Sequence, residues 1–65
     1  MADQVRVALD VGMSLEQAWA LAQFVKRVTF TGVRECAAED AEARVMLEAL
    51  EIVRRALADV DIAPR

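Results

Sequence analysis

Few side chains in this chain could carry out chemistry, and their types exclude most reactions. The 65 residues include no histidine and no tyrosine, a single cysteine, Cys36, and a single serine, Ser14. Nucleophilic catalysis needs a nucleophile, a base and a group that orients the base. Cys36 has no imidazole to activate it, and Ser14 is predicted to cap a helix. We therefore expect a protein that is not an enzyme, with Cys36 as a small, partly buried hydrophobic residue.

Metal and cofactor sites are not expected either. One thiolate without histidine cannot build a structural zinc site. The two glycines, Gly12 and Gly32, stand far apart rather than in a glycine-rich phosphate-binding loop.

The charged residues that do cluster are acidic. One interpretation is that they lie at the start of the last helix and interact favourably with its dipole, each contributing about 0.3–1 kcal/mol. A second is a contact patch for a basic protein partner. A third, a cation site, lacks the ligand spacing and turn glycine of a calcium loop. The candidate partner-binding residues are Glu35, Glu39, Asp40, Glu42 and Glu48.

The charge distribution bears on the kind of partner. Residues 35–65 hold eight acids and four bases, whereas residues 1–34 hold three acids and four bases. An acidic second half argues against direct nucleic-acid binding, which depends on clustered lysine and arginine. It favours a protein partner with a basic surface.

Helical segments are expected to position these groups. Ser14 and Gln17 form the pattern of a capping box, which predicts a helix over about 15–28, with Trp19 and Phe24 in the core. A short turn or helix is predicted over about 33–37, with Thr31 as a weak cap, and a long helix over about 39–60. In the long helix, Glu51 can pair with the arginines three and four residues later.

The long helix carries two apolar stripes, which together cover more than half of its surface. Because the first helix is too short to cover both, the excess indicates self-association or a protein-binding surface. One stripe consists of Met46, Leu50, Val53, Leu57 and Val60, and the other of Val45, Ala49, Ile52 and Ala56.

The N-terminal part has a different period. Apolar and other residues alternate over 5–11, which predicts a β-strand with one apolar face. A strand needs a partner for its backbone groups. That partner could be a second copy of the chain or the sheet edge of a target; alternatively the segment curls onto its own helices. The residues expected to face the interior of a strand-paired homodimer are Val5, Val7, Leu9 and Val11.

Size and composition also favour a homodimer. A chain of 65 residues is one small domain, and a single cysteine excludes an intrachain disulfide. We predict a mainly α domain over 1–65, with one N-terminal strand, as an intertwined or strand-paired homodimer. No apolar run is long enough to span a bilayer, and the N-terminus lacks the pattern of a signal peptide, so we expect a cytoplasmic protein.

The order of strand, capped helix, glycine turn and helix resembles the ribbon-helix-helix repressors over residues 5 to about 50. In that family two chains pair their strands and read DNA with the outward side chains. The resemblance therefore implies a DNA-binding regulator or antitoxin, in which Arg6, Ala8 and Asp10 would face the major groove.

Most of the chain also resembles a set of small helical proteins of bacteriophages and mobile elements. The resemblance rests on "SLEQAWALAQFVKRV", the acidic loop, the alanine-rich long helix and the terminal "APR". That set includes anti-CRISPR proteins, which bind a CRISPR effector complex and block DNA recognition. The resemblance implies an inhibitor that covers a basic groove with its acidic face in the bacterial cytoplasm.

Overall fold

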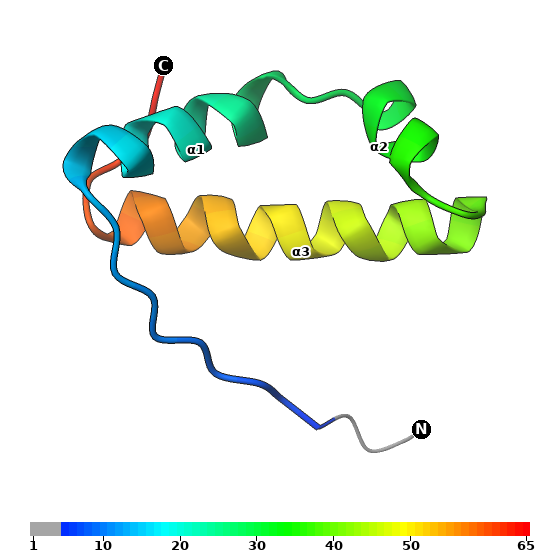
Figure 1. Ribbon diagram of the computed structural model, residues 1–65, viewed down its shortest axis with the longest axis horizontal. Coiled ribbons are helices and arrows are strands. Elements are labelled where there is room, and N and C mark those ends of the chain that lie inside the picture. Colours follow the sequence, from blue (N-terminus) through cyan, green and yellow to red (C-terminus); the bar gives the residue numbers. More distant parts are fainter. Residues whose placement is uncertain (1–4) are drawn as a thin grey trace.

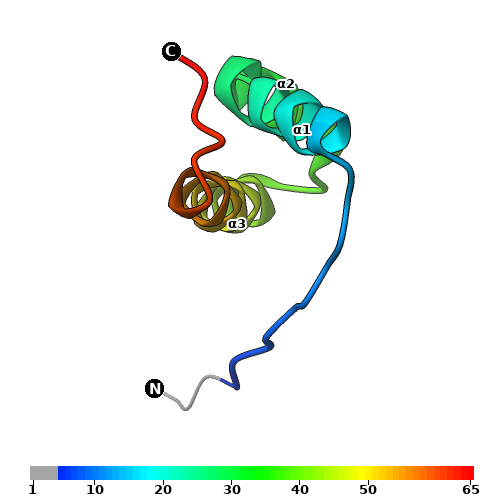
Figure 2. The ribbon, with the colours of Figure 1, turned by 90° about the vertical axis from the view of Figure 1, so that its left-hand side faces the viewer.

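Three helices in two layers make up the body of the protein. The computed structural model describes residues 5–65, in which helices α1 (Leu15–Arg27), α2 (Phe30–Cys36) and α3 (Asp40–Asp59) follow one another. Helices α1 and α2 lie end to end in one layer and both pack on α3, which forms the other layer (Figures 1 and 2). The mainly α expectation agrees with this arrangement.

The start of α1 is fixed by the predicted capping box. The Gln17 backbone N–H donates to Ser14 Oγ at 3.0 Å, and the Ser14 N–H donates to Gln17 Oε1 at 2.9 Å. Both bonds satisfy backbone donors that a helix start leaves without an intrahelical partner. The helix ends at Arg27, next to Lys26, where two cations suit the negative end of the dipole.

Helix α2 begins earlier than the sequence indicated. Its cap is Thr29, whose Oγ1 accepts the Gly32 N–H at 3.2 Å, and not Thr31, which lies inside the helix. Both threonines can cap a helix. Thr29 follows Val28, where the backbone is extended and α1 has ended, so the helix starts at the first suitable residue.

The end of α3 folds the last residues back onto the core. Asp61 has a positive φ of 68°, and the Ile62 N–H donates to the Leu57 carbonyl at 2.9 Å. The Asp61 N–H donates to the Ala58 carbonyl at 2.9 Å, which completes a Schellman motif. The motif brings Ile62 against Leu57 in the buried cluster.

The core of the described residues is small. Its central cluster consists of Ala18, Ala22, Leu57 and Ile62, and Val33 and Ala43 are buried in addition. Three of these six residues are alanines. The accessible surface of 5533 Å² exceeds the roughly 4,100 Å² typical of a folded chain of this mass. Much of the excess belongs to residues 5–14, which are all exposed.

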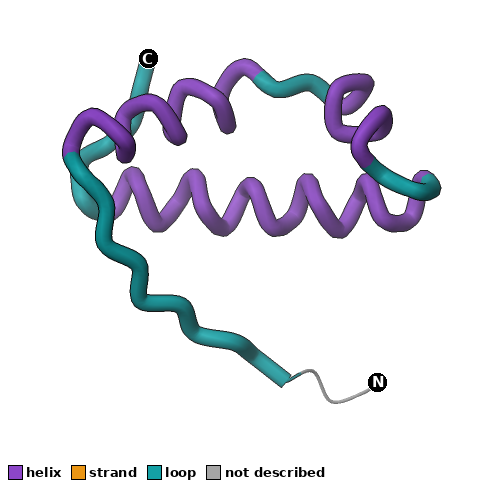
Figure 3. Tube along the Cα trace, in the orientation of Figure 1, coloured by secondary structure: helices purple, strands orange, loops and turns teal. Residues whose placement is uncertain are grey.

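The predicted N-terminal strand is wrong. Residues 5–14 form an extended arm without strand pairing that runs away from the helices, and no strand occurs within residues 5–65 (Figures 1 and 3). Val5 is 90% exposed, and Val7, Leu9 and Val11 are also largely exposed. The reason is that every other described element is helical, so the chain offers no strand edge to pair with. The strand-paired homodimer and the ribbon of the repressor family are therefore not supported.

Within residues 5–65, none of the three helices is both long enough and apolar enough to cross a bilayer.

Candidate protein-binding surface

An apolar groove opens between the layer of α1 and α2 and the side of α3. Its volume is about 530 Å³, within the range of small-molecule binding pockets. All three helices contribute to it, and its lining residues are Phe24, Val28, Gly32, Val33, Cys36, Met46, Ala49, Leu50 and Val53.

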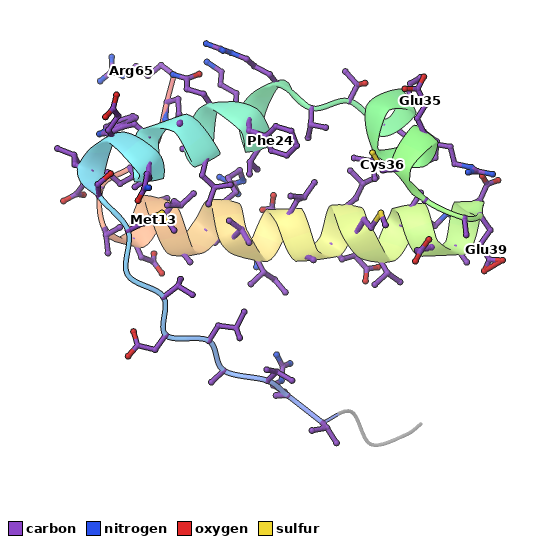
Figure 4. The ribbon with its side chains drawn as sticks, viewed as in Figure 1. Met13, Phe24, Glu35, Cys36, Glu39 and Arg65 are labelled. Atoms are coloured by element: carbon purple, nitrogen blue, oxygen red, sulfur yellow. The ribbon has the colours of Figure 1, made fainter. Side chains whose placement is uncertain are left out.

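The groove exists because the two helices of the upper layer do not form one continuous rod. Residues 28–29 between α1 and α2 are extended, and Phe24 points from the last turn of α1 toward α3 just before this break (Figure 4). Phe24 stays 56% exposed, and Trp19 is also partly exposed. The expectation that both aromatic residues belong to the core is wrong, because the core consists mainly of smaller residues.

Cys36 also differs from its expectation. It was expected to be partly buried, but it is exposed at the end of α2, where it lines the groove with Val33. Figure 4 shows its side chain on the inner side of α2. It therefore contributes a small apolar group to the groove wall.

Two of the five predicted acidic residues hold the turn between α2 and α3. Arg34 Nε donates to Asp40 Oδ1 at 2.6 Å, and Arg34 Nη1 donates to the Ala37 carbonyl at 3.0 Å. The Ala38 N–H donates to Glu42 Oε1 at 2.6 Å. Asp40 and Glu42 also lie in the first turn of α3, where the helix dipole favours acids. These contacts support the structural interpretation for both residues.

The other three acids are exposed, and among residues 5–65 they have no ion pair or side-chain hydrogen bond. Glu39 is the residue before α3 and its side chain makes no cap bond. Glu35 and Glu39 point away from the body at the end where α2 turns into α3 (Figure 4). Glu48 lies elsewhere, because six residues separate it from Glu42, about 120° around the helix. The structure thus brings four acids to one end of the molecule and leaves Glu48 apart.

A second charged group lies on the outer surface of α3. Arg54 Nε donates to Glu51 Oε1 at 2.8 Å, and Arg55 Nε donates to Glu51 Oε2 at 3.1 Å. The predicted pairing of Glu51 with both arginines is therefore confirmed. The Arg54 hydrogen bond, supported by Arg55, lowers the pKa of the Glu51 carboxyl to about 2.

The groove and the Arg34–Asp40 pair were not predicted from the sequence. The groove results from the break at residues 28–29, and the arginine and its acid are six residues apart across a turn, a spacing that no helical rule covers. Among the described residues, no buried side chain is polar, and no three metal-ligating side chains lie close enough to hold an ion.

The whole chain, residues 1–65, matches the model of a family of unknown function, DUF7706. The chain belongs to this family. Neither the comparison with curated proteins nor the comparison with solved structures found a match.

Proposed function

We propose that this member of DUF7706 acts by binding another protein in the apolar groove. The observation that carries the proposal is the groove itself, whose walls come from all three helices and whose rim carries exposed Phe24. Apolar grooves between helices are a common binding site for the apolar face of a partner segment. Large side chains that become buried near the centre of an interface contribute much of the binding energy, so a partner that covers Phe24 would gain from burying it.

The charges at one end of the groove support a partner with basic residues. Cys36 ends α2 in the groove wall, and Glu35 and Glu39 lie at the same end of the molecule with side chains that point away from the body (Figure 4). Neither acid is engaged within the described residues, so both are available to a cationic group. Complementary charges of this kind speed the encounter of two proteins and fix the orientation of the partner. The partner segment is therefore apolar along one face and basic at the end that meets this turn.

More specifically, we propose that the protein is an inhibitor from a bacteriophage or mobile element. It binds a CRISPR effector complex in the bacterial cytoplasm and covers the basic groove that recognises DNA. This setting rests on the sequence resemblance; the acidic turn and the apolar groove are compatible with it. The DNA-binding alternative depended on the N-terminal strand, so it is not carried further.

The test is a DNA-binding assay with purified CRISPR effector complexes of several types, with and without this protein. The wild-type protein is expected to abolish target-DNA binding by one of them. The double reversal Glu35→Lys/Glu39→Lys and the groove variant Phe24→Asp should each weaken inhibition at least about tenfold, which corresponds to about 1.4 kcal/mol.

A matched control keeps the same change in net charge. The double variant Asp10→Lys/Glu16→Lys reverses two exposed acids outside the groove and should inhibit like the wild type. Full inhibition by both the acidic-turn and groove variants would contradict the proposed surface. Failure of the wild-type protein on every effector would remove the CRISPR setting, whereas binding of cationic amphipathic peptides that Phe24→Asp abolishes would still support the groove.

A further inference from the structure

The second apolar stripe of α3 remains uncovered in the folded chain. Val45 is 62% exposed and Ile52 is 63% exposed, and the two alanines of the stripe, Ala49 and Ala56, are exposed as well. The four residues follow spacings of four, three and four, which is the repeat of a helix seam that packs against another helix. On the helix, this stripe lies about 130° from the face that packs on α1 and α2.

We propose that this stripe is the interface of a homodimer, in which α3 packs antiparallel against α3 of a second copy. Placing Ala49 opposite the partner's Ile52 also places Val45 opposite the partner's Ala56. Each layer of the seam then pairs one branched side chain with one alanine, so the helices approach evenly along the contact. A parallel pair would instead stack Ile52 on its own copy and alanine on alanine, which leaves gaps.

The charges beside the stripe are self-complementary in the same register. Glu48 and Arg55 flank one side of the stripe, seven residues apart, and the antiparallel register brings Glu48 of each chain next to the partner's Arg55. Arg55 can serve this contact because Glu51, its partner within the chain, is also held by two hydrogen bonds from Arg54. The symmetry of the dimer repeats the pair, so two interchain ion pairs form.

The other side of the stripe is apolar. Met46 and Val53 flank it there and are half-buried, and the same register places Met46 next to the partner's Val53. The 62% exposed Val45 and the 63% exposed Ile52 supply apolar area for an interface of this kind. The Glu42 and Asp59 side chains meet across the dimer at both ends of the seam, and their like charges limit it to the four stripe residues.

The first test is the mass of the full chain in solution, measured by sedimentation velocity from about 1 to 300 µM. The wild-type protein is expected to pass from monomer to dimer in this range. Ile52→Lys should weaken the dimer by about 100-fold or more, since it places a cation in the seam, while circular dichroism keeps the helix content because Ile52 is exposed. The matched control Leu9→Lys changes an exposed apolar residue of the arm and should dimerise like the wild type.

The second test reverses the charges of Glu48 and Arg55 beside the stripe. Glu48→Arg alone should weaken the dimer about tenfold, because it replaces two attractive contacts by two repulsive ones. The double variant Glu48→Arg/Arg55→Glu restores both pairs with opposite signs and should return to within about threefold of the wild type. If the double variant keeps its helix content but does not regain dimer affinity, the proposed register is wrong.

Disulfide trapping tests whether the two α3 helices run antiparallel or parallel to each other. In a Cys36→Ser background, Val45→Cys and Ala56→Cys chains are mixed and oxidised, and the antiparallel seam predicts the mixed disulfide as the main product. Products that link two Val45→Cys chains would indicate a parallel pair. A wild-type monomer at 300 µM, or a dimer lost in Leu9→Lys and kept in Ile52→Lys, would contradict the proposal. These assays need no target, so they measure dimer formation separately from binding in the groove, although Met46, Ala49 and Val53 line the groove as well.

Discussion

The two faces of α3 are both apolar but have opposite environments. One face, with Ala43 and Leu57, is buried under α1, α2 and the C-terminal residues. The other, with Val45 and Ile52, is exposed. Both faces lie on one helix and are apolar, and the presence of a covering element decides what each face does. The inner face holds the fold together and the outer face is available for binding.

The largest expected effect comes from removing side-chain volume on the inner face. Leu57→Ala leaves a cavity in the cluster that also contains Ile62, and we expect a loss of about 2–5 kcal/mol of unfolding free energy. Ile52→Ala on the outer face should cost about 0.5 kcal/mol or less. Urea unfolding of both variants at a few micromolar, where the proposed dimer is expected to be dissociated, compares them. Equal losses would show that the two faces are not distinct.

Substitutions that add side-chain volume should also distinguish the inner face of α3 from the outer face. Ala43 is completely buried, so Ala43→Leu overpacks the contact and should cost about 1–3 kcal/mol. Ala56→Leu makes the same change on the exposed face and should leave the stability of the monomer nearly unchanged. Thermal unfolding followed by circular dichroism measures both, and a destabilised Ala56→Leu monomer would argue that something in the chain already covers this face.

The capping residues of α1 and α3 also affect how firmly the inner face of α3 is covered. Ser14→Ala removes the side-chain acceptor of the capping box at the start of α1, and we expect a loss of about 1 kcal/mol. Glu39→Asp is the opposite change at α3, since it keeps the charge and supplies the shorter side chain that caps well; it should stabilise the protein by up to about 1 kcal/mol. Chemical unfolding checks both signs, and a neutral Ser14→Ala would mean that the cap does not hold α1 in place.

The smallest expected effect concerns pH and the exposed Glu51. Its folded pKa of about 2 lies below the ordinary 4.5 because Arg54 donates hydrogen bonds to the charged form. A lowered folded pKa means that the contribution to stability is present above pH 4.5 and is lost as the pH falls toward 2. Solvent screening keeps this contribution small. Glu51→Gln should lower the melting temperature slightly at pH 6 and match the wild type near pH 2; a constant difference at both pH values would contradict this assignment.

Sequence patterns predicted the parts of the structure that depend on local chemistry. The Ser14–Gln17 box marks the start of α1, Glu51 pairs with arginines at helical spacing, and the second stripe of α3 proved to be uncovered. Each of these follows from contacts within a few residues or from the period of one helix.

Features that depend on distant elements were not predicted. The alternation over 5–11 is typical of a strand, but a strand also requires an edge, which the three helices do not provide. The groove depends on where α1 stops relative to α3, and the Arg34–Asp40 contact depends on the direction of the turn between α2 and α3. The sequence identified the acidic residues, but it did not show that the fold already uses Asp40 and Glu42 in the turn between α2 and α3.

The most direct test of the difference between the two faces is a dilution series of the ¹⁵N-labelled wild-type chain by NMR, from about 500 to 10 µM. The antiparallel seam predicts that the backbone signals of Val45, Ala49, Ile52 and Ala56 shift together with those of Glu48 and Arg55, while the signals of Leu57, Ala18 and the arm stay constant. Shifts confined to Val5–Val11, or no shift at any residue across this range, would contradict the assignment of the outer face of α3 as the binding face.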